Sequence, residues 1–506
     1  MKRLTVLLLL LSVVGCAVNP VTGKRELGLV SRAQEISIGQ EQYQPSQQMQ
    51  GGQYSVDSAL TEYVSGVGQK LAAVTGIDLP FEFVVLNNSV PNAWALPGGK
   101  IALNRGLLVE LNSEAELAAV LGHEIAHATA RHGARSMERG LLLKGAMVAA
   151  MIGTSNSNYA GAVLGAGALG AQLITTKYGR DAEREADYYG TRYLADAGYD
   201  PRASVSLQQT FVRLSEGRQQ NWLSGMFASH PPSRERVENN RIRAAELGEA
   251  GKVGKSQYKS AMAYLDSKKA AYAAYDESSK LAKKKEWDAA ASLVGKALAI
   301  EPAEGAFHGL RGDIRFKQKR YEDAVTNYNR AIQRDDAYFA WYLGRGLSHS
   351  KLDKRNAARG DFENSLRILP TAIAYNELGQ LAERDGNEEA ALRYYAQAAK
   401  SGSSAGQQAA ASYLSIDLPR RPASYVKSDI INSAQGPGLW VKNATSETLK
   451  NIQVRVSLTW GERNTDNYIE TIGQLGPGKE TLVRLRLRDS QLLDANAYAV
   501  SADIAR

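Results

Sequence analysis

The sequence has a single cysteine, Cys16, among its 506 residues. An intramolecular disulfide is therefore excluded, and stability must come from buried cores, for which this length is ample. Histidine is also scarce, with six residues, so a cluster of histidines is informative. No basic stretch is interleaved with aromatic residues, although the formal net charge is +8. That absence argues against nucleic-acid binding, and the length predicts two to four domains.

The N-terminus lacks an apolar run long enough for a transmembrane helix, since the run from Leu4 to Val14 is too short. Basic residues precede this run and Cys16 follows it, which is typical of a secretory signal peptide. The ending "VVGC" resembles a bacterial lipobox, in which cleavage before the cysteine precedes its lipidation. We predict a signal peptide over residues 1–15 and a lipid anchor on Cys16. An ordinary signal peptide with an incidental cysteine is the alternative. Because Ala17 and not an aspartate follows, we expect the outer membrane, with the body of the protein in the periplasm.

A second apolar region, residues 141–175, is rich in alanine, glycine and leucine and is interrupted by polar "TSNSNY". Neither half is an apolar run well suited to span a membrane. We predict buried helices, or a mobile lid over a functional site, rather than a transmembrane hairpin.

Between residues 271 and 406 the same residue types recur every 33 or 34 positions. The columns are Gly312, Gly346 and Gly379; Ala290, Ala324, Ala358 and Ala391; Val294, Tyr328, Phe362 and Tyr395; and Ala297, Ala331, Ser365 and Ala398. Small residues where paired helices touch, with an aromatic residue four positions on, resemble tetratricopeptide repeats. We predict about four repeats within residues 255–415, with unrelated helical hairpins as the alternative.

From residue 425 onwards the pattern of apolar and polar residues changes. Apolar and polar residues alternate in stretches such as "IQVRVSLTW", and Gly, Asn and Pro separate them. This pattern predicts a small β-sandwich over residues 425–506, whose task the sequence does not reveal.

The stretch "HEIAH" places His123, Glu124 and His127 on one segment. On a helix, positions i and i+4 share a face, so both imidazoles can reach one cation. Ser113 and Glu116 form a capping-box pattern at the start of that helix. The alternative is a helix with incidental histidines.

A catalytic zinc ion needs three protein ligands and one open position. His132 stands one residue away from the third histidine of HExxHxxGxxH, so we interpret it as a helix-end residue. A later helical stretch, residues 179–201, offers Glu183 and Asp187 at i and i+4. One of the two can bind the metal while the other orients a ligand histidine. The alternative is a solvated acidic stripe.

HExxH on one helix with ExxxD on a later one is the gluzincin arrangement. The blocks "NPVTGKREL", "NAWALPGGKIALNRGLL", "HEIAHATARH", "EREAD" and "SHPPSRERV" resemble those of metallopeptidase family forty-eight, over roughly residues 17–245. With its repeats, the chain is similar to the periplasmic lipoprotein type of that family. The resemblance implies one Zn²⁺ per chain, bound by His123, His127 and Glu183. It also implies Glu124 as the catalytic base and Asp187 as the supporting carboxylate.

The fold expected for the whole chain is multidomain. It comprises a lipid-anchored N-terminal segment (16–55), a mainly α, zincin-like metallopeptidase domain with a small β-sheet (56–245), an α-solenoid of tetratricopeptide repeats (255–415) and a small C-terminal β-sandwich (425–506).

The expected function is that of a zinc metalloendopeptidase hydrolysing misfolded or stalled envelope proteins in the periplasm. Its repeats would recruit these clients or the outer-membrane assembly machinery. Membrane-embedded members of the family have transmembrane helices, and none is convincing here, so a prenylated substrate is not implied. The alternative is a repeat-based chaperone or scaffold with a latent zinc site. The intact Glu124 argues against that alternative.

The sequence leaves the role of two further features undecided. His230 in "SHPPSRERV" could stabilise the oxyanion, occupy the open zinc position, or be an ordinary loop histidine. Residues 92–96 could form an edge strand that pairs with an extended substrate, or an ordinary hairpin edge.

Overall fold

The computed structural model describes residues 16–140, 178–217, 230–248, 250–433, 436–460, 464–485 and 492–505. The predicted signal peptide and the apolar region 141–175 lie outside these ranges. The protein is multidomain, and it divides into two compact units, Met1–Leu369 and Pro370–Arg506. Among the helices in the described ranges, none combines the length and the apolar character needed to cross a membrane.

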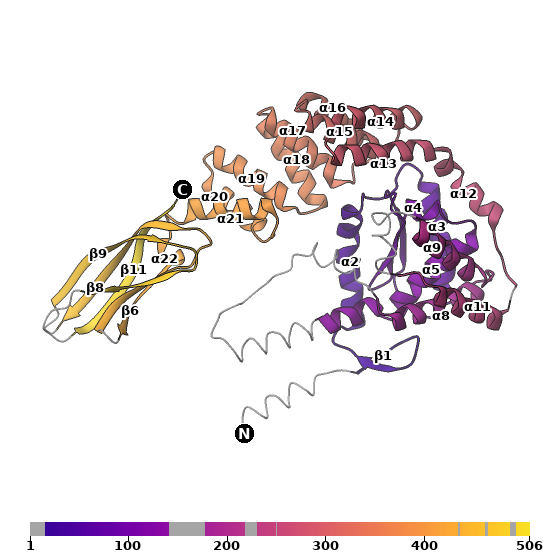
Figure 1. Ribbon diagram of the computed structural model, residues 1–506, viewed down its shortest axis with the longest axis horizontal. Coiled ribbons are helices and arrows are strands. Elements are labelled where there is room, and N and C mark those ends of the chain that lie inside the picture. The colour runs from indigo at the N-terminus through magenta and orange to yellow at the C-terminus, as the bar shows by residue number, and fades with distance from the viewer. Residues whose placement is uncertain are drawn as a thin grey trace, which may run out of the picture. The chain divides into compact units, whose positions relative to one another are not determined.

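The first unit begins with a small hairpin and contains a three-stranded sheet (Figure 1). In the hairpin, β1 (Cys16–Val18) pairs antiparallel with β2 (Arg25–Leu27). The sheet has the order β3–β5–β4, from β3 (Glu82–Leu86), β5 (Lys100–Asn104) and β4 (Ala93–Leu96). Strand β3 runs parallel to β5, and β4 runs antiparallel to it. A Pro-Gly-Gly turn joins β4 to β5, where Gly98 and Gly99 have φ of 78° and 83°, which favours glycine.

Helices cover both faces of this sheet, so β4 and β5 are buried along their whole length. Ala93 and Ala95 face a core shared with α3 (Ser58–Ala73) and α5 (Glu114–Thr129). Trp94 and Leu96 face the other side, where Tyr43 of α2 (Arg32–Met49) packs. Within the described residues, β5 is the only strand paired with β4, whose outer edge is thus the sheet edge. The proposal that a substrate pairs there stays a prediction.

Further helices described in the peptidase region are the short α4 (Arg105–Leu108), α8 (Arg180–Asp196), α9 (Ala203–Gly217) and α11 (Arg234–Leu247). Helices α8 and α9 pack against α5, and α11 packs against α8 and α9. Helices α5 and α8 meet backbone to backbone at Gly122 and Gly190. A Cβ atom on Gly190 would lie 2.9 Å from the carbonyl carbon of Gly122 and from the nitrogen of His123. This approach brings the HExxH face of α5 against the acidic face of α8.

A Gly190→Ala substitution is therefore expected to force the two helices apart. Because the clashing atoms belong to the backbone, we expect a loss of about 1–3 kcal/mol in the free energy of unfolding. Denaturant unfolding checks this, with Gly295→Ala as the control. Gly295 lies inside a helix and an added Cβ there would meet no atom within 4 Å. That control should gain about 0.5–1 kcal/mol, and an equal response of the two variants would contradict the packing argument.

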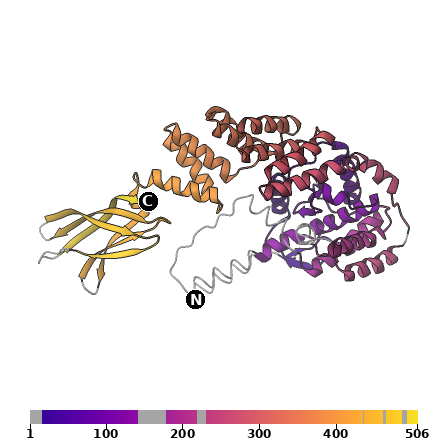
Figure 2. The same ribbon diagram turned by 45° about the horizontal axis from the view of Figure 1, so that its top comes forward.

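The repeat region begins with α12 (Lys255–Ser267) and continues as helix pairs (Figure 2). The first unit contains α13 (Lys269–Lys283), α14 (Trp287–Ile300), α15 (Gly305–Lys317), α16 (Tyr321–Arg334), α17 (Phe339–Lys351) and α18 (Arg355–Ile368). The alanine and aromatic columns of the sequence are all buried. A Cβ on Gly312 would lie 2.8 Å from the Tyr328 ring, and one on Gly346 equally close to Phe362. The aromatic residues of the repeats thus pack directly on the glycines, which is why both residue types recur with the period.

The second unit holds the last repeat helices and all-β structure. Its helices are α19 (Ala372–Arg384), α20 (Glu388–Ala398), α21 (Ser404–Asp417) and α22 (Pro422–Tyr425). One sheet has the order β10–β7–β6, from Glu480–Arg484, Gly436–Asn443 and Val426–Ser433. The other has the order β11–β8–β9, from Leu492–Ile504, Leu449–Trp460 and Asn464–Leu475. Alternate residues of β8, including Val454 and Val456, enter a core that Val441 of β7 shares.

Candidate metal centre

Helix α5 carries the HExxH motif, and its two ends are set by specific contacts. At the start, the Ser113 hydroxyl accepts a hydrogen bond from the backbone of Glu116, at 3.2 Å. The Glu116 carboxylate binds the backbone N–H of Asn112 instead of that of Ser113, so only half of the predicted capping box forms. At the other end the helix stops at Thr129, because Arg131 takes a left-handed φ of 60°.

Buried contacts hold this left-handed residue in place. The Arg131 guanidinium donates to the Glu35 carboxylate at 2.5 Å and to the Val30 carbonyl oxygen at 2.6 Å. A second helical segment, residues 132–140, starts directly after it. The sharp turn places His132 back against α5.

Four buried side chains converge where α5 meets α8. Ligand-type atoms of His123, His127, Glu183 and His230 all lie within 4.8 Å of one another. The Nε2 atoms of the two α5 histidines are 3.0 Å apart, as expected for i and i+4 on one face. Glu183 Oε1 is 3.4 Å from His127 Nε2 and 2.9 Å from His230 Nδ1. Helix α8 and the segment before α11 thus complete the group begun by α5.

This donor set fits a zinc ion. Three imidazole nitrogens and one carboxylate oxygen, all buried and facing a common point, are ligand types that Zn²⁺ prefers. Burial alone would raise the pKa of Glu183, but the surrounding His230, His123 and His127 hold it well below its usual range. The carboxylate is therefore anionic and ready to bind a cation. Burial lowers the pKa of His127, which favours the neutral ring that a metal requires.

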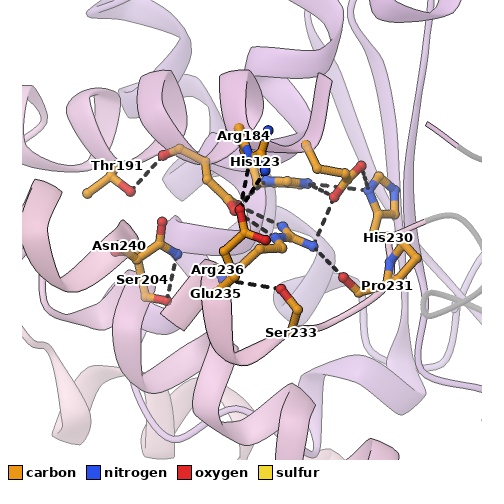
Figure 3. A network of polar contacts seen from close by, with 12 residues as sticks. His123, Arg184, Thr191, Ser204, His230, Pro231, Ser233, Glu235, Arg236 and Asn240 are labelled. Atoms are coloured by element: carbon orange, nitrogen blue, oxygen red, sulfur yellow. Dashed lines mark hydrogen bonds and ion pairs between the residues drawn. The ribbon is translucent and has the colours of Figure 1, made fainter. Parts of the chain in front are cut away.

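Asp187 and Arg236 support the group from one side, and the polar contacts of Arg236 can be followed in Figure 3. Asp187 Oδ1 lies 3.0 Å from His123 Nδ1, the ring nitrogen that faces away from the other ligands. Arg236 donates to both Asp187 oxygens at 2.7 Å, and its Nη1 is 2.9 Å from Glu183 Oε2. Although burial opposes ionisation, Arg236 and His123 keep the pKa of Asp187 below its usual value. One arginine thus pairs with two buried carboxylates and keeps the pKa of Asp187 low.

Arg236 is a site residue that the sequence analysis did not single out, although it stands within "SHPPSRERV". One signal was available. Ser233 caps α11 by accepting from the backbone N–H of Arg236 at 3.2 Å, which places this arginine in the first helical turn. A cation is disfavoured at a helix N-terminus, so an arginine there implies an anionic partner.

Glu124 faces the group without a hydrogen-bond partner of its own. It is fully buried, and neither carboxylate oxygen has a partner among the described residues. His230 Nε2 lies 3.7 Å from Glu124 Oε1. Burial raises the pKa of Glu124, which makes its carboxylate a stronger base.

His132 and Tyr178 contact His127 from its far side. His132 Nδ1 is 2.7 Å from His127 Nδ1, and the Tyr178 ring stacks on the His127 ring with centroids 4.2 Å apart. His132 is thus outside the group of four, yet it touches one of its members. Tyr178 had no signal in the sequence.

Comparisons with known proteins match two parts of the chain to known families. The profile of Peptidase family M48 matches residues 58–244, and that of a TPR repeat matches residues 312–353. A putative beta-barrel assembly-enhancing protease of Vibrio cholerae is 36% identical over 197 residues, which are 38% of this chain and 40% of that protein. The beta-barrel assembly-enhancing protease of Yersinia pestis is 29% identical, over 54% of this chain and 62% of its own. Metalloprotease YcaL of Escherichia coli is 34% identical, over 35% of this chain and 68% of its own. The chain therefore spans less than two thirds of the first two relatives.

Proposed function

Since the chain belongs to peptidase family M48, as its motifs indicated, we propose that it is a zinc-dependent endopeptidase. One Zn²⁺ would be held by His123, His127 and Glu183. The observation that carries this proposal is the group of four buried donors beside an unpartnered buried carboxylate, Glu124.

The side chains around the group have distinct tasks in this proposal. A bound zinc ion would act as a Lewis acid and lower the pKa of a water molecule towards about 7. Glu124 accepts the proton of the water that attacks the peptide carbonyl and then passes it to the leaving amine. Asp187 orients His123, and Arg236 pairs with both Asp187 and Glu183.

A cleavage assay on an unfolded protein tests the activity. Hydrolysis should stop when a chelator removes the metal and return when Zn²⁺ is added back. Cleavage that ignores the chelator, or no cleavage under any condition, would favour the alternative, a repeat-based chaperone or scaffold with a latent zinc site.

His230 is proposed to occupy the fourth position and hold the enzyme latent, because its Nδ1 lies 3.3 Å from His123 Nε2 and 2.9 Å from Glu183. A His230→Ala variant should then hydrolyse peptides severalfold faster and show an altered spectrum when Co²⁺ replaces zinc. His349→Ala, in a repeat helix, is the control. Slower hydrolysis would instead assign His230 to the oxyanion, and unchanged rate and spectrum would remove it from the site.

The cellular setting is proposed from the sequence and the relatives together. The signal-peptide pattern ending at Cys16 supports a lipid anchor, with the body in the periplasm and the anchor in the outer membrane. Misfolded or stalled envelope proteins are the proposed substrates. The repeats would recruit them, or the outer-membrane assembly machinery, in keeping with the names of the Vibrio and Yersinia relatives. The two sheets of the second unit, which share one core, support a β-sandwich.

A further inference from the structure

The two histidines of the HExxH motif are supported in different ways at the ring nitrogen that faces away from the group. For His123 this nitrogen is Nδ1, and it faces the carboxylate of Asp187 at 3.0 Å. For His127 it is again Nδ1, but it faces another imidazole, that of His132, at 2.7 Å. His132 is 1% exposed, so water does not compete for this contact. The contact that supports His127 therefore depends on a neutral His132 ring.

The chemistry of imidazole fixes where each proton lies along this contact. His127 Nε2 faces Glu183 and His123, so a metal held there takes the lone pair of Nε2. The neutral His127 ring then carries its proton on Nδ1 and donates it. His132 Nδ1 must accept, which leaves the proton of His132 on Nε2. That Nε2 lies 3.6 Å from Glu185 Oε2, a carboxylate placed to favour this tautomer.

The contacts continue from Glu185 to the N-terminal hairpin. Arg135 lies between two carboxylates, with Nη2 at 3.4 Å from Glu185 Oε2 and Nη1 at 2.7 Å from Glu26 Oε1. The buried Asn19 donates to Glu26 Oε1 at 3.1 Å and to the carbonyl oxygen of Ala130, at the end of α5, at 3.2 Å. Arg135 Nη2 and His132 Nε2 thus approach the same Glu185 oxygen, Oε2, and Arg135 holds that oxygen in place.

We propose that His132 is a positioning residue of the metal centre, which fixes the tautomer and ring orientation of His127, with Glu185 fixing the tautomer of His132. This inference rests on the proposed zinc site. It gives α8 two separate roles, since Glu183 is a ligand while Glu185, on another face of the same helix, acts through His132. If His132 only packed against Tyr178, losing its hydrogen-bond acceptor would not affect the metal site.

Two replacements of His132 separate positioning from packing. His132→Phe keeps an aromatic ring but loses the acceptor, whereas His132→Asn places its side-chain oxygen close to where Nδ1 stood. Each full-length variant is titrated with Zn²⁺ against a chromogenic chelator, and its Co²⁺-substituted form is examined by visible absorption. Loss of a group that orients a metal ligand typically costs about 10–100-fold in metal affinity, which is the loss expected for His132→Phe. His132→Asn should recover most of the affinity and the parent cobalt spectrum.

Glu185→Gln should weaken Zn²⁺ binding less than His132→Phe, because it acts one residue further from the metal. Glu235→Gln is the matched control, since Glu235 is half exposed and pairs with Arg184. Equal zinc affinity and an unchanged cobalt spectrum in His132→Phe would overturn the inference, as would an affinity equally low in His132→Phe and His132→Asn. A parent protein that binds no Zn²⁺ would instead overturn the proposed function, so the two failures are distinct.

Discussion

Replacing Glu124 by glutamine is expected to abolish peptide hydrolysis while zinc stays bound. Glutamine has the shape of glutamate but cannot take a proton from water. General-base catalysis contributes about 10²–10⁴-fold to a rate, and the loss should be at least of that size. Glu124 is not one of the four converging donors, so the affinity for Zn²⁺ should not fall.

The measurement combines the rate of cleavage of an unfolded protein with the zinc content after dialysis. Glu41→Gln is the control, since Glu41 is an exposed residue of α2 that accepts a hydrogen bond from Ser37. Full activity in Glu124→Gln would refute the assignment of the base. Lost zinc in that variant would show that Glu124 is a ligand instead.

Replacing Arg236 by methionine is expected to cost about 3–5 kcal/mol of unfolding free energy, the usual consequence of removing one partner of a buried ion pair. Arg236 contacts Asp187 and Glu183, and both carboxylates are nearly inaccessible to water. Without the guanidinium they are two like charges in a buried site, with only histidines to compensate them. Binding of zinc should weaken as well, because Asp187 loses the partner that orients it towards His123.

Denaturant unfolding of the zinc-free protein measures this cost, and a second substitution shows its origin. In the double variant with Asp187→Asn, one buried charge is gone, so much of the lost stability should return. Arg184→Met is the control, because Arg184 forms its ion pair with Glu235 on the surface and should change stability little. A double variant less stable than Arg236→Met alone would contradict the electrostatic explanation.

The sequence was sufficient for those parts of the site that depend on local spacing. His123 and His127 share a helix face at i and i+4, and that face is the one the structure turns towards α8. The spacing of Glu183 and Asp187 could not decide which of them reaches the metal group. In the structure Glu183 lies on the ligand side, 3.4 Å from His127 Nε2, and Asp187 lies behind His123. This choice depends on how α5 crosses α8, a long-range property.

His132 shows a second limit of reasoning from periodicity. A helix continuing through residue 132 would turn this side chain away from the face of His123 and His127. The helix instead stops at Thr129, and the left-handed Arg131 reverses the chain locally. That conformation is held by Glu35 and Val30, about a hundred residues earlier in the sequence. The repeats were easier to predict because each contact joins neighbouring helices and recurs with the period.

The hydrophobic core beneath the metal centre continues into the repeats. One cluster includes Val85 and Leu103 of the sheet together with Phe307 of α15. The Arg105 guanidinium lies 3.6 Å above the ring of Tyr272 in α13, and Asn87 donates to Glu304 at 2.9 Å. This sharing restricts evolution by gene fusion. A different repeat array could replace the present one only if its first helices supplied the same buried side chains.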